Sequence, residues 1–200
     1  MVRPQPRLRR ELRVYAAGDP AEQLVARESV RDLIARYNAN GDSGRIEQMV
    51  QVFAPDAVFE TLDLRFEGRD AIRDFFSGVT RTAAGPQERV PDTPSVADWK
   101  ARGNTPMLRH ITGTTQIDVV DEHSVKARSY YYVIVPHGLD HWGRYLDEFG
   151  LVDGEWRITY RKEHTDGVFV GGWAHQSAGE AVADVLTHPV DWVPPETSQP

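Results

Sequence analysis

The chain has 200 residues, of which 40% are hydrophobic and 26% are charged, so it can form one globular domain with a core. Its formal net charge of -7 argues against nucleic acid as the main partner, because phosphate binding needs a basic surface. The lack of cysteine excludes disulfides, thiolate metal sites and a cysteine nucleophile, and no apolar run approaches the roughly 18 residues of a membrane span. We therefore expect a cytoplasmic protein without a membrane partner.

Three parts are expected along the chain. Residues 1–19 carry five arginines and two prolines, and we interpret them as an N-terminal arm. The main domain is expected to span residues 20–166, because Asp19 is a plausible helix N-cap and Pro20 suits the first helical position. Residues 167–200 form an extension that we expect to pack on the domain or on a partner subunit through Trp173 and Trp192.

The stretch from residue 27 to residue 60 predicts a helix, a turn that holds Asp42, a second helix and a strand. Both helices repeat apolar residues at the spacing of one buried face. These residues are Ala26, Val30, Leu33, Ile34 and Tyr37 on the first helix, and Ile46, Met49, Val50 and Phe53 on the second. Ala54-Pro55-Asp56 should end the second helix, because a residue before proline avoids the helical region. A strand is expected at 57–61.

A strand at 64–67 follows a turn at Asp63, and Gly68-Arg69-Asp70 opens a third helix. Residues 80–105 are predicted to form a long loop of the kind that acts as a lid or stays disordered. Four strands are expected after it, at 107–120, 124–135, 141–151 and 156–164, with a hairpin at Asp153-Gly154 and a possible short helix at 178–186. Helices followed by antiparallel strands predict an α+β architecture.

His110 is the first candidate for chemistry, since histidine is the side chain best suited to proton transfer near neutral pH. On a regular strand it shares a face with Leu108 and Thr112, while Ile111 and Thr115 point the other way. A single strand histidine is more often structural than catalytic. Asp42 has a competing explanation as well, because an aspartate just before a helix is a common N-cap.

The chain resembles the NTF2-like superfamily, in particular its SnoaL-like branch, over roughly residues 22–165. The resemblance rests on RESVRDLIARYNANGD, VQVFAPDAVFE, FEGRDAIRDFF, RHITGTTQID and DGEWRITYRKEH. It implies a cone-shaped α+β barrel, in which N-terminal helices pack on a curved, mostly antiparallel sheet. The motifs are fairly specific to the superfamily, but they are not specific to one activity.

The resemblance to scytalone dehydratase and to hexachlorocyclohexane dehydrochlorinase implies a catalytic pair of Asp42 and His110. In this pair the carboxylate orients the imidazole, and the imidazole takes a proton from a substrate carbon. The same resemblance implies substrate contacts for three tyrosines and one arginine, namely Tyr37, Tyr131, Tyr145 and Arg161. The tyrosines could instead simply fill the core, and Arg161 could be a solvated charge at a strand end.

His137, Asp140 and His141 lie close together in the sequence and could be taken for a metal site. They fall at a predicted hairpin, where the spacing does not ensure that they converge, so we expect no metal. No phosphate-binding glycine loop with a strand–helix context and no G-x-S-x-G motif is present, so we expect no nucleotide cofactor and no serine nucleophile.

These observations predict a cofactor-independent lyase of the dehydratase type, acting in an enclosed pocket on a small, mostly apolar, oxygenated molecule. An isomerase or a polyketide-type cyclase is an alternative that would use the same pair. A non-catalytic small-molecule-binding domain or a dioxygenase β-subunit-like domain is an alternative of another class. We also expect a homodimer or a higher homo-oligomer.

Overall fold

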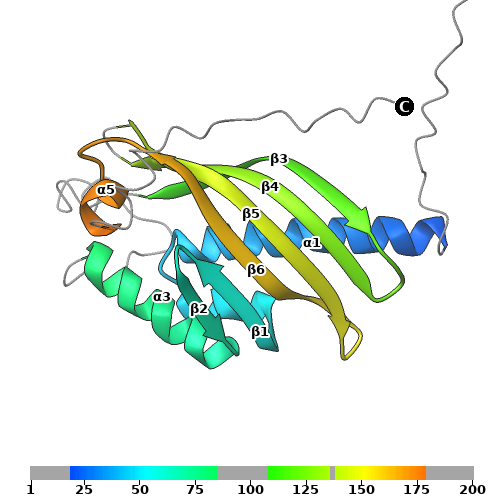
Figure 1. The fold of residues 1–200 in the computed structure, drawn as a ribbon. Helices are drawn as coiled ribbons and strands as arrows, with labels where there is room; N and C mark the ends of the chain where they lie inside the picture. Colours follow the sequence, from blue (N-terminus) through cyan, green and yellow to red (C-terminus); the bar gives the residue numbers. More distant parts are fainter. Residues whose placement is uncertain (1–18, 85–107, 136–137, 179–200) are drawn as a thin grey trace, which may run out of the picture.

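The computed structural model describes residues 19–84, 108–135 and 138–178 (Figure 1). Helices come first and strands follow, which confirms the α+β class. In chain order, the elements are α1 (Pro20–Gly41), α2 (Ile46–Met49), the 3-10 helix η1 (Val50–Val52), β1 (Phe53–Thr61), β2 (Leu64–Glu67), α3 (Arg69–Ala84), β3 (Arg109–Val119), β4 (Ser124–Val135), β5 (Gly138–Val152), β6 (Glu155–Val168) and α5 (Trp173–Ala178).

The six strands form one mixed sheet in the order β2-β1-β6-β5-β4-β3. Among the described strands, only the β1–β6 pair is parallel, which confirms a mostly antiparallel sheet. In the part of the chain that is described, the sheet is curved but not closed, because β2 and β3 lie at its two edges. Helix α1 crosses its inner face and α3 lies beside β1 and β2, so that helices complete the cone (Figure 1).

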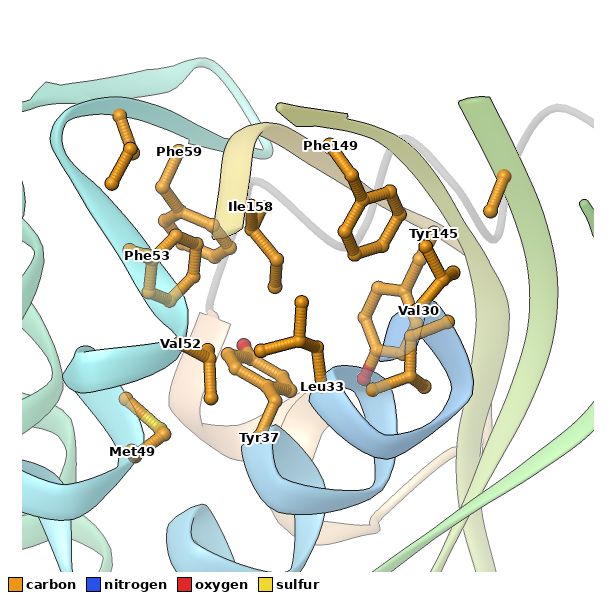
Figure 2. Close-up of a cluster of buried hydrophobic side chains, with 14 of the residues drawn as sticks. Val30, Leu33, Tyr37, Met49, Val52, Phe53, Phe59, Tyr145, Phe149 and Ile158 are labelled. Atoms are coloured by element: carbon orange, nitrogen blue, oxygen red, sulfur yellow. The ribbon is translucent and has the colours of Figure 1, made fainter. Parts of the chain in front are cut away.

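The start and the buried face of α1 follow the sequence pattern. The Asp19 side chain accepts a hydrogen bond from the backbone N–H of Ala21 at 3.0 Å, and Pro20 occupies the first turn. All five apolar residues of the predicted stripe are buried. Figure 2 shows Val30, Leu33 and Tyr37 pointing toward the core of the sheet. This packing fixes the C-terminal end of α1, where Asp42 lies, relative to the strands.

The second helix is shorter than we expected, and the first strand begins earlier. Helix α2 ends at Met49, η1 follows, and β1 begins at Phe53, where φ is −87° and ψ is 147°. The prediction that Phe53 lies on the helical stripe is therefore wrong, as is the helix end at Ala54-Pro55-Asp56. Pro55 favours extended backbone before it, and Phe53 pairs with Ile158 of β6 while its side chain is completely buried.

The remaining strands agree closely with the predictions. Strands β2 and β4 have the expected bounds, and β5 and β6 are each a few residues longer than expected. Asp153 and Gly154 both have positive φ angles, of 52° and 79°, as a tight hairpin turn requires. Helix α3 continues to Ala84, into the stretch that we expected to be a loop.

Several predictions fall outside the described residues. The arm, the rest of the predicted loop with Trp99, most of the predicted helix at 178–186, and Trp192 lie there. The division into an arm, a domain and an extension therefore stays a prediction. In the part of the chain that is described, no helix is both long enough and apolar enough to cross a membrane.

Candidate active site

Asp42 and His110 meet where the end of α1 lies against the start of β3. Asp42 follows the last residue of α1, and its backbone N–H donates to the Asn38 carbonyl at 2.9 Å. Its Oδ1 lies 2.7 Å from Nδ1 of His110, and its Oδ2 accepts a hydrogen bond from the backbone N–H of His110 at 3.0 Å. The carboxylate therefore holds both the ring and the backbone of one residue.

This geometry overturns the helix-cap explanation of Asp42. The N-cap of α2 is Arg45, and no side chain caps that helix. A carboxylate can only accept, so we assign the Nδ1 proton to His110, which leaves its Nε2 as a lone-pair acceptor. The Asp42 side chain is 8% exposed and that of His110 is 26% exposed, so the carboxylate is shielded while the ring reaches solvent.

A second link joins the same two elements one helical turn earlier. The side-chain amide of Asn38 donates a hydrogen bond to the hydroxyl of Thr112, two residues after His110 on β3. A bulge follows Thr112 in the pairing with β4, and Thr112 and Thr115 both line one hollow beside α1. Thr115 therefore lies on the same face as His110 and not on the opposite face, as it would on a regular strand, because the extra residue reverses the alternation.

Tyr131 lies beside this pair, on β4. Its ring centroid is 6.2 Å from that of His110, and its hydroxyl donates to Oε1 of Glu163 at 2.7 Å. Thr61 donates to the other oxygen of Glu163 at 3.0 Å. Burial raises the pKa of Tyr131, and the Glu163 charge adds to this, so the phenol stays protonated. The neighbours Tyr130 and Tyr132 are exposed, as strand alternation requires.

Tyr37, Tyr145 and Arg161 lie deeper, in the core. Nε and Nη2 of Arg161 donate to the two carboxylate oxygens of Asp147, at 2.7 Å each. The guanidinium lies 4.2 Å from the centre of the Tyr37 ring and 4.4 Å from that of Tyr145. Burial alone would lower the pKa of Arg161, but the Asp147 carboxylate more than offsets it, so the net direction is upward.

The side chain of Arg161 is completely buried, so the alternative of a solvated charge at a strand end is wrong. In this arrangement Tyr37, Tyr145 and Arg161 form part of the packed interior. Their predicted contacts with a substrate stay predictions.

The sequence analysis missed a second histidine–aspartate pair, on β5. Nδ1 of His141 lies 2.8 Å from Oδ2 of Asp140, and both side chains are almost fully buried. The His141 ring is 6.2 Å from His110, 6.0 Å from Tyr131 and 6.1 Å from Trp173 of α5, centroid to centroid. Three strands thus bring two imidazoles and a phenol together.

Two other expectations concern metals and pockets. Among the described residues, no three histidine or acidic side chains are grouped so as to hold a metal ion, and His137 lies outside these residues. Two described hollows, of about 440 and 140 Å³, are lined by neither His110 nor Asp42. An enclosed pocket around the pair stays a prediction.

Comparison with known proteins identifies the scaffold. A family model described as a SnoaL-like domain matches residues 22–162. No curated protein sequence matches the chain significantly.

Similar solved structures include a protein of unknown function from Mycobacterium tuberculosis, with 26% identity and a TM-score of 0.57 over 86% of this chain and 91% of that one. A candidate scytalone dehydratase from Novosphingobium aromaticivorans has 20% identity and a TM-score of 0.55, over 72% and 87% of the two chains. The hexachlorocyclohexane dehydrochlorinase LinA-type3 from Novosphingobium barchaimii has 12% identity and a TM-score of 0.59, over 76% and 93%. These likenesses establish the NTF2-like, cystatin-like fold.

Proposed function

Because the chain belongs to the SnoaL-like family, we propose that it is a cofactor-independent lyase of the dehydratase type. His110 is the base and Asp42 orients it. The observation that carries the proposal is the double hydrogen bond from Asp42 to the ring and backbone of His110, which directs Nε2 away from the carboxylate. The substrate is a small, mostly apolar molecule with a carbonyl and a hydroxyl group in β relation.

The reaction needs one base and no external reagent. Nε2 of His110 takes a proton from the carbon beside the carbonyl, and the electron pair of that C–H bond forms the new C=C bond. The bond to the β-hydroxyl oxygen breaks at the same time. That oxygen then takes the proton back from the imidazolium and leaves as water, so His110 ends in its starting state.

The shielded carboxylate suits this role. Asp42 stabilises the imidazolium that forms during the transfer, and its attraction is stronger where water is scarce. The His110 ring is partly exposed, so a substrate can reach Nε2. The pair therefore combines a protected orienting group with an accessible base.

The test is the loss of turnover in the His110→Ala variant on β-hydroxy ketones. A general base contributes on the order of 10²-fold or more, so turnover should fall at least that far while circular dichroism stays unchanged. His123→Ala is the matched control, because that side chain is 69% exposed in the turn between β3 and β4. Normal turnover in His110→Ala would exclude His110 as the base.

The products separate the elimination from its alternatives. An isomerase or a polyketide-type cyclase built on the same pair would give a shifted double bond or a new ring, without net loss of water. No turnover with any carbonyl substrate would favour a non-catalytic binding domain or a dioxygenase β-subunit-like domain.

The homodimer or higher oligomer stays a prediction. Large apolar side chains are exposed on the outward face of β3, β4 and β5: Ile111, Tyr130, Tyr132, Ile134, Leu139 and Trp142. A sheet face of this kind could be covered by a second copy. Light scattering that gave only the 22.6 kDa mass of one chain would contradict the prediction.

A further inference from the structure

We propose that His141 is a second substrate-contacting residue, whose Nε2 accepts a hydrogen bond from a hydroxyl group of the substrate. The proposal rests on the proposed function, since it assumes that the substrate reaches His110. It narrows the substrate class to molecules that carry a free O–H group beside the reacting carbon, as an alcohol, an enol or a phenol.

A bulge in β5 turns His141 and Asp140 toward the same side. Val133 of β4 pairs with His141, but the next residue, Ile134, pairs with Leu139, so Asp140 is an extra residue. On a regular strand Asp140 and His141 would point to opposite faces. Both are buried instead, and consecutive inward side chains are what a bulge produces.

The strand pairing places His110 and His141 on either side of Val133. Val133 pairs with His110 on β3 and with His141 on β5, so the three side chains share the inner face. The two imidazole rings lie 6.2 Å apart at an interplanar angle of 84°. A small molecule in contact with Nε2 of His110 would therefore be close to the His141 ring.

Asp140 fixes the His141 ring through Nδ1. The same carboxylate also accepts hydrogen bonds from the backbone N–H groups of Trp173, at 2.5 Å, and Ala174, at 3.0 Å. The close contact between Asp140 and the chain just before α5 requires glycine at position 172, since a Cβ there would lie 2.5 Å from Oδ1 of Asp140. Asp140 thus anchors the start of α5, and α5 in turn holds Asp140 in place.

His141 is set up as an acceptor. Burial lowers its pKa, and the Asp140 hydrogen bond offsets this only in part, so the ring is neutral at neutral pH. The charged and titratable groups near it are Asp140, His110, Glu163 and the Tyr131 phenol. His141 donates its Nδ1 proton to the Asp140 carboxylate, so Nε2 of the neutral ring carries a lone pair, and among the described residues none donates a hydrogen bond to that atom.

The hydroxyl of Tyr131 does not compete for this role, because it is already bonded to Glu163. A site with an oriented acceptor rejects an analogue that lacks the matching donor. We therefore expect His141 to discriminate between a free hydroxyl group and its methyl ether, which has a similar shape but no O–H.

The experiment compares phenol with anisole as probes, using 15N-histidine NMR on the full chain. Phenol should bind at millimolar concentration and shift the Nε2 resonance of His141. Anisole should bind more weakly, by about tenfold or more. In His141→Asn, the amide keeps a donor for Asp140 but lacks Nε2, so the preference for phenol should disappear. In His123→Ala, whose side chain is 69% exposed in the turn between β3 and β4, the preference should remain.

Four results would overturn the proposal. These are no phenol binding at millimolar concentration, equal binding of phenol and anisole, an unchanged preference in His141→Asn, or a protonated His141 at pH 7 in the wild type. The resonance shift in the wild type decides the matter if His141→Asn does not fold. None of these results depends on turnover, so the His110→Ala test of the proposed function stands or fails separately.

Discussion

The two histidine–aspartate pairs use the same side chains in different surroundings. Asp42 lies 68 residues before His110 in the chain, and its carboxylate oxygens both bond to that one residue. Asp140 is the neighbour of His141 and accepts hydrogen bonds from His141, Trp173 and Ala174. The two carboxylates thus have different further partners, and we expect these partners to set what each imidazole can do.

A carboxylate that serves one imidazole can stabilise the positive charge that forms there during proton transfer. A carboxylate that also serves two backbone N–H groups, in a dry interior, fixes the position of a neutral ring. The side chain of His110 is 26% exposed and that of His141 is 8% exposed, so the first ring is more accessible and the second is more firmly enclosed. This difference agrees with the proposal that the first pair transfers a proton and the second recognises the substrate.

The largest expected effect is on turnover, in Asp42→Asn. An amide has only one acceptor oxygen, so it cannot satisfy both N–H groups of His110, and it cannot stabilise an imidazolium through charge. We expect kcat to fall on the order of 10²-fold or more, together with a loss of stability of roughly 1–3 kcal/mol from the N–H group that is left without an acceptor. Steady-state kinetics and calorimetry on one preparation measure both. A variant with normal kcat would remove the distinction between the pairs.

The matched change, Asp140→Asn, should act mainly on stability. The amide nitrogen would face an N–H group that the carboxylate now accepts, and a buried donor without a partner costs roughly 1–3 kcal/mol. Urea unfolding should show this loss, together with faster hydrogen exchange at the start of α5. If Asp140→Asn lost turnover as severely as Asp42→Asn and kept its stability, the assignment would be reversed.

The smallest expected effect is the dependence of stability on pH. The pKa of His141 is lower in the folded state than in the unfolded chain, where it is near 6.5. Below about pH 6.5 the unfolded chain therefore binds more protons than the folded chain. As the pH is lowered, the free energy of unfolding decreases until the pH is below the folded pKa of His141. Urea titrations across this window should show a shallower slope in His141→Asn. Equal slopes in the two proteins would contradict the neutral state of His141.

Much of the first pair could be predicted from the sequence. The apolar stripe of α1 is regular, so the position of Asp42 at the end of a core-packed helix follows from spacing alone. Strand alternation placed His110 on one face with Thr112, and the resemblance supplied the expectation that the two residues meet. Glu163 could have been found as well, because it lies two residues after the buried Arg161 and so shares its face.

The second pair could not be predicted in the same way. A bulge leaves no clear mark in the sequence, since it depends on how two strands are matched in space. Without it, Asp140 and His141 belong to opposite faces, and their closeness to His137 in the sequence raised only a metal site, which we did not expect. Phe53 was misplaced for a related reason. Its helical spacing was correct, but pairing with Ile158 and the demands of Pro55 outweighed that local signal.

Because Asp140 is an extra residue in β5, the number of residues in this part of the strand indicates whether a relative can form the second pair. A homologue with one residue fewer between its counterparts of Gly138 and His141 would have a regular strand there, with the aspartate turned to the outer surface. Such a homologue would keep the pair that we propose for proton transfer and lose the proposed acceptor. The length of this short interval should therefore separate family members that prefer hydroxylated compounds from those that accept their ethers, even where both histidines are retained.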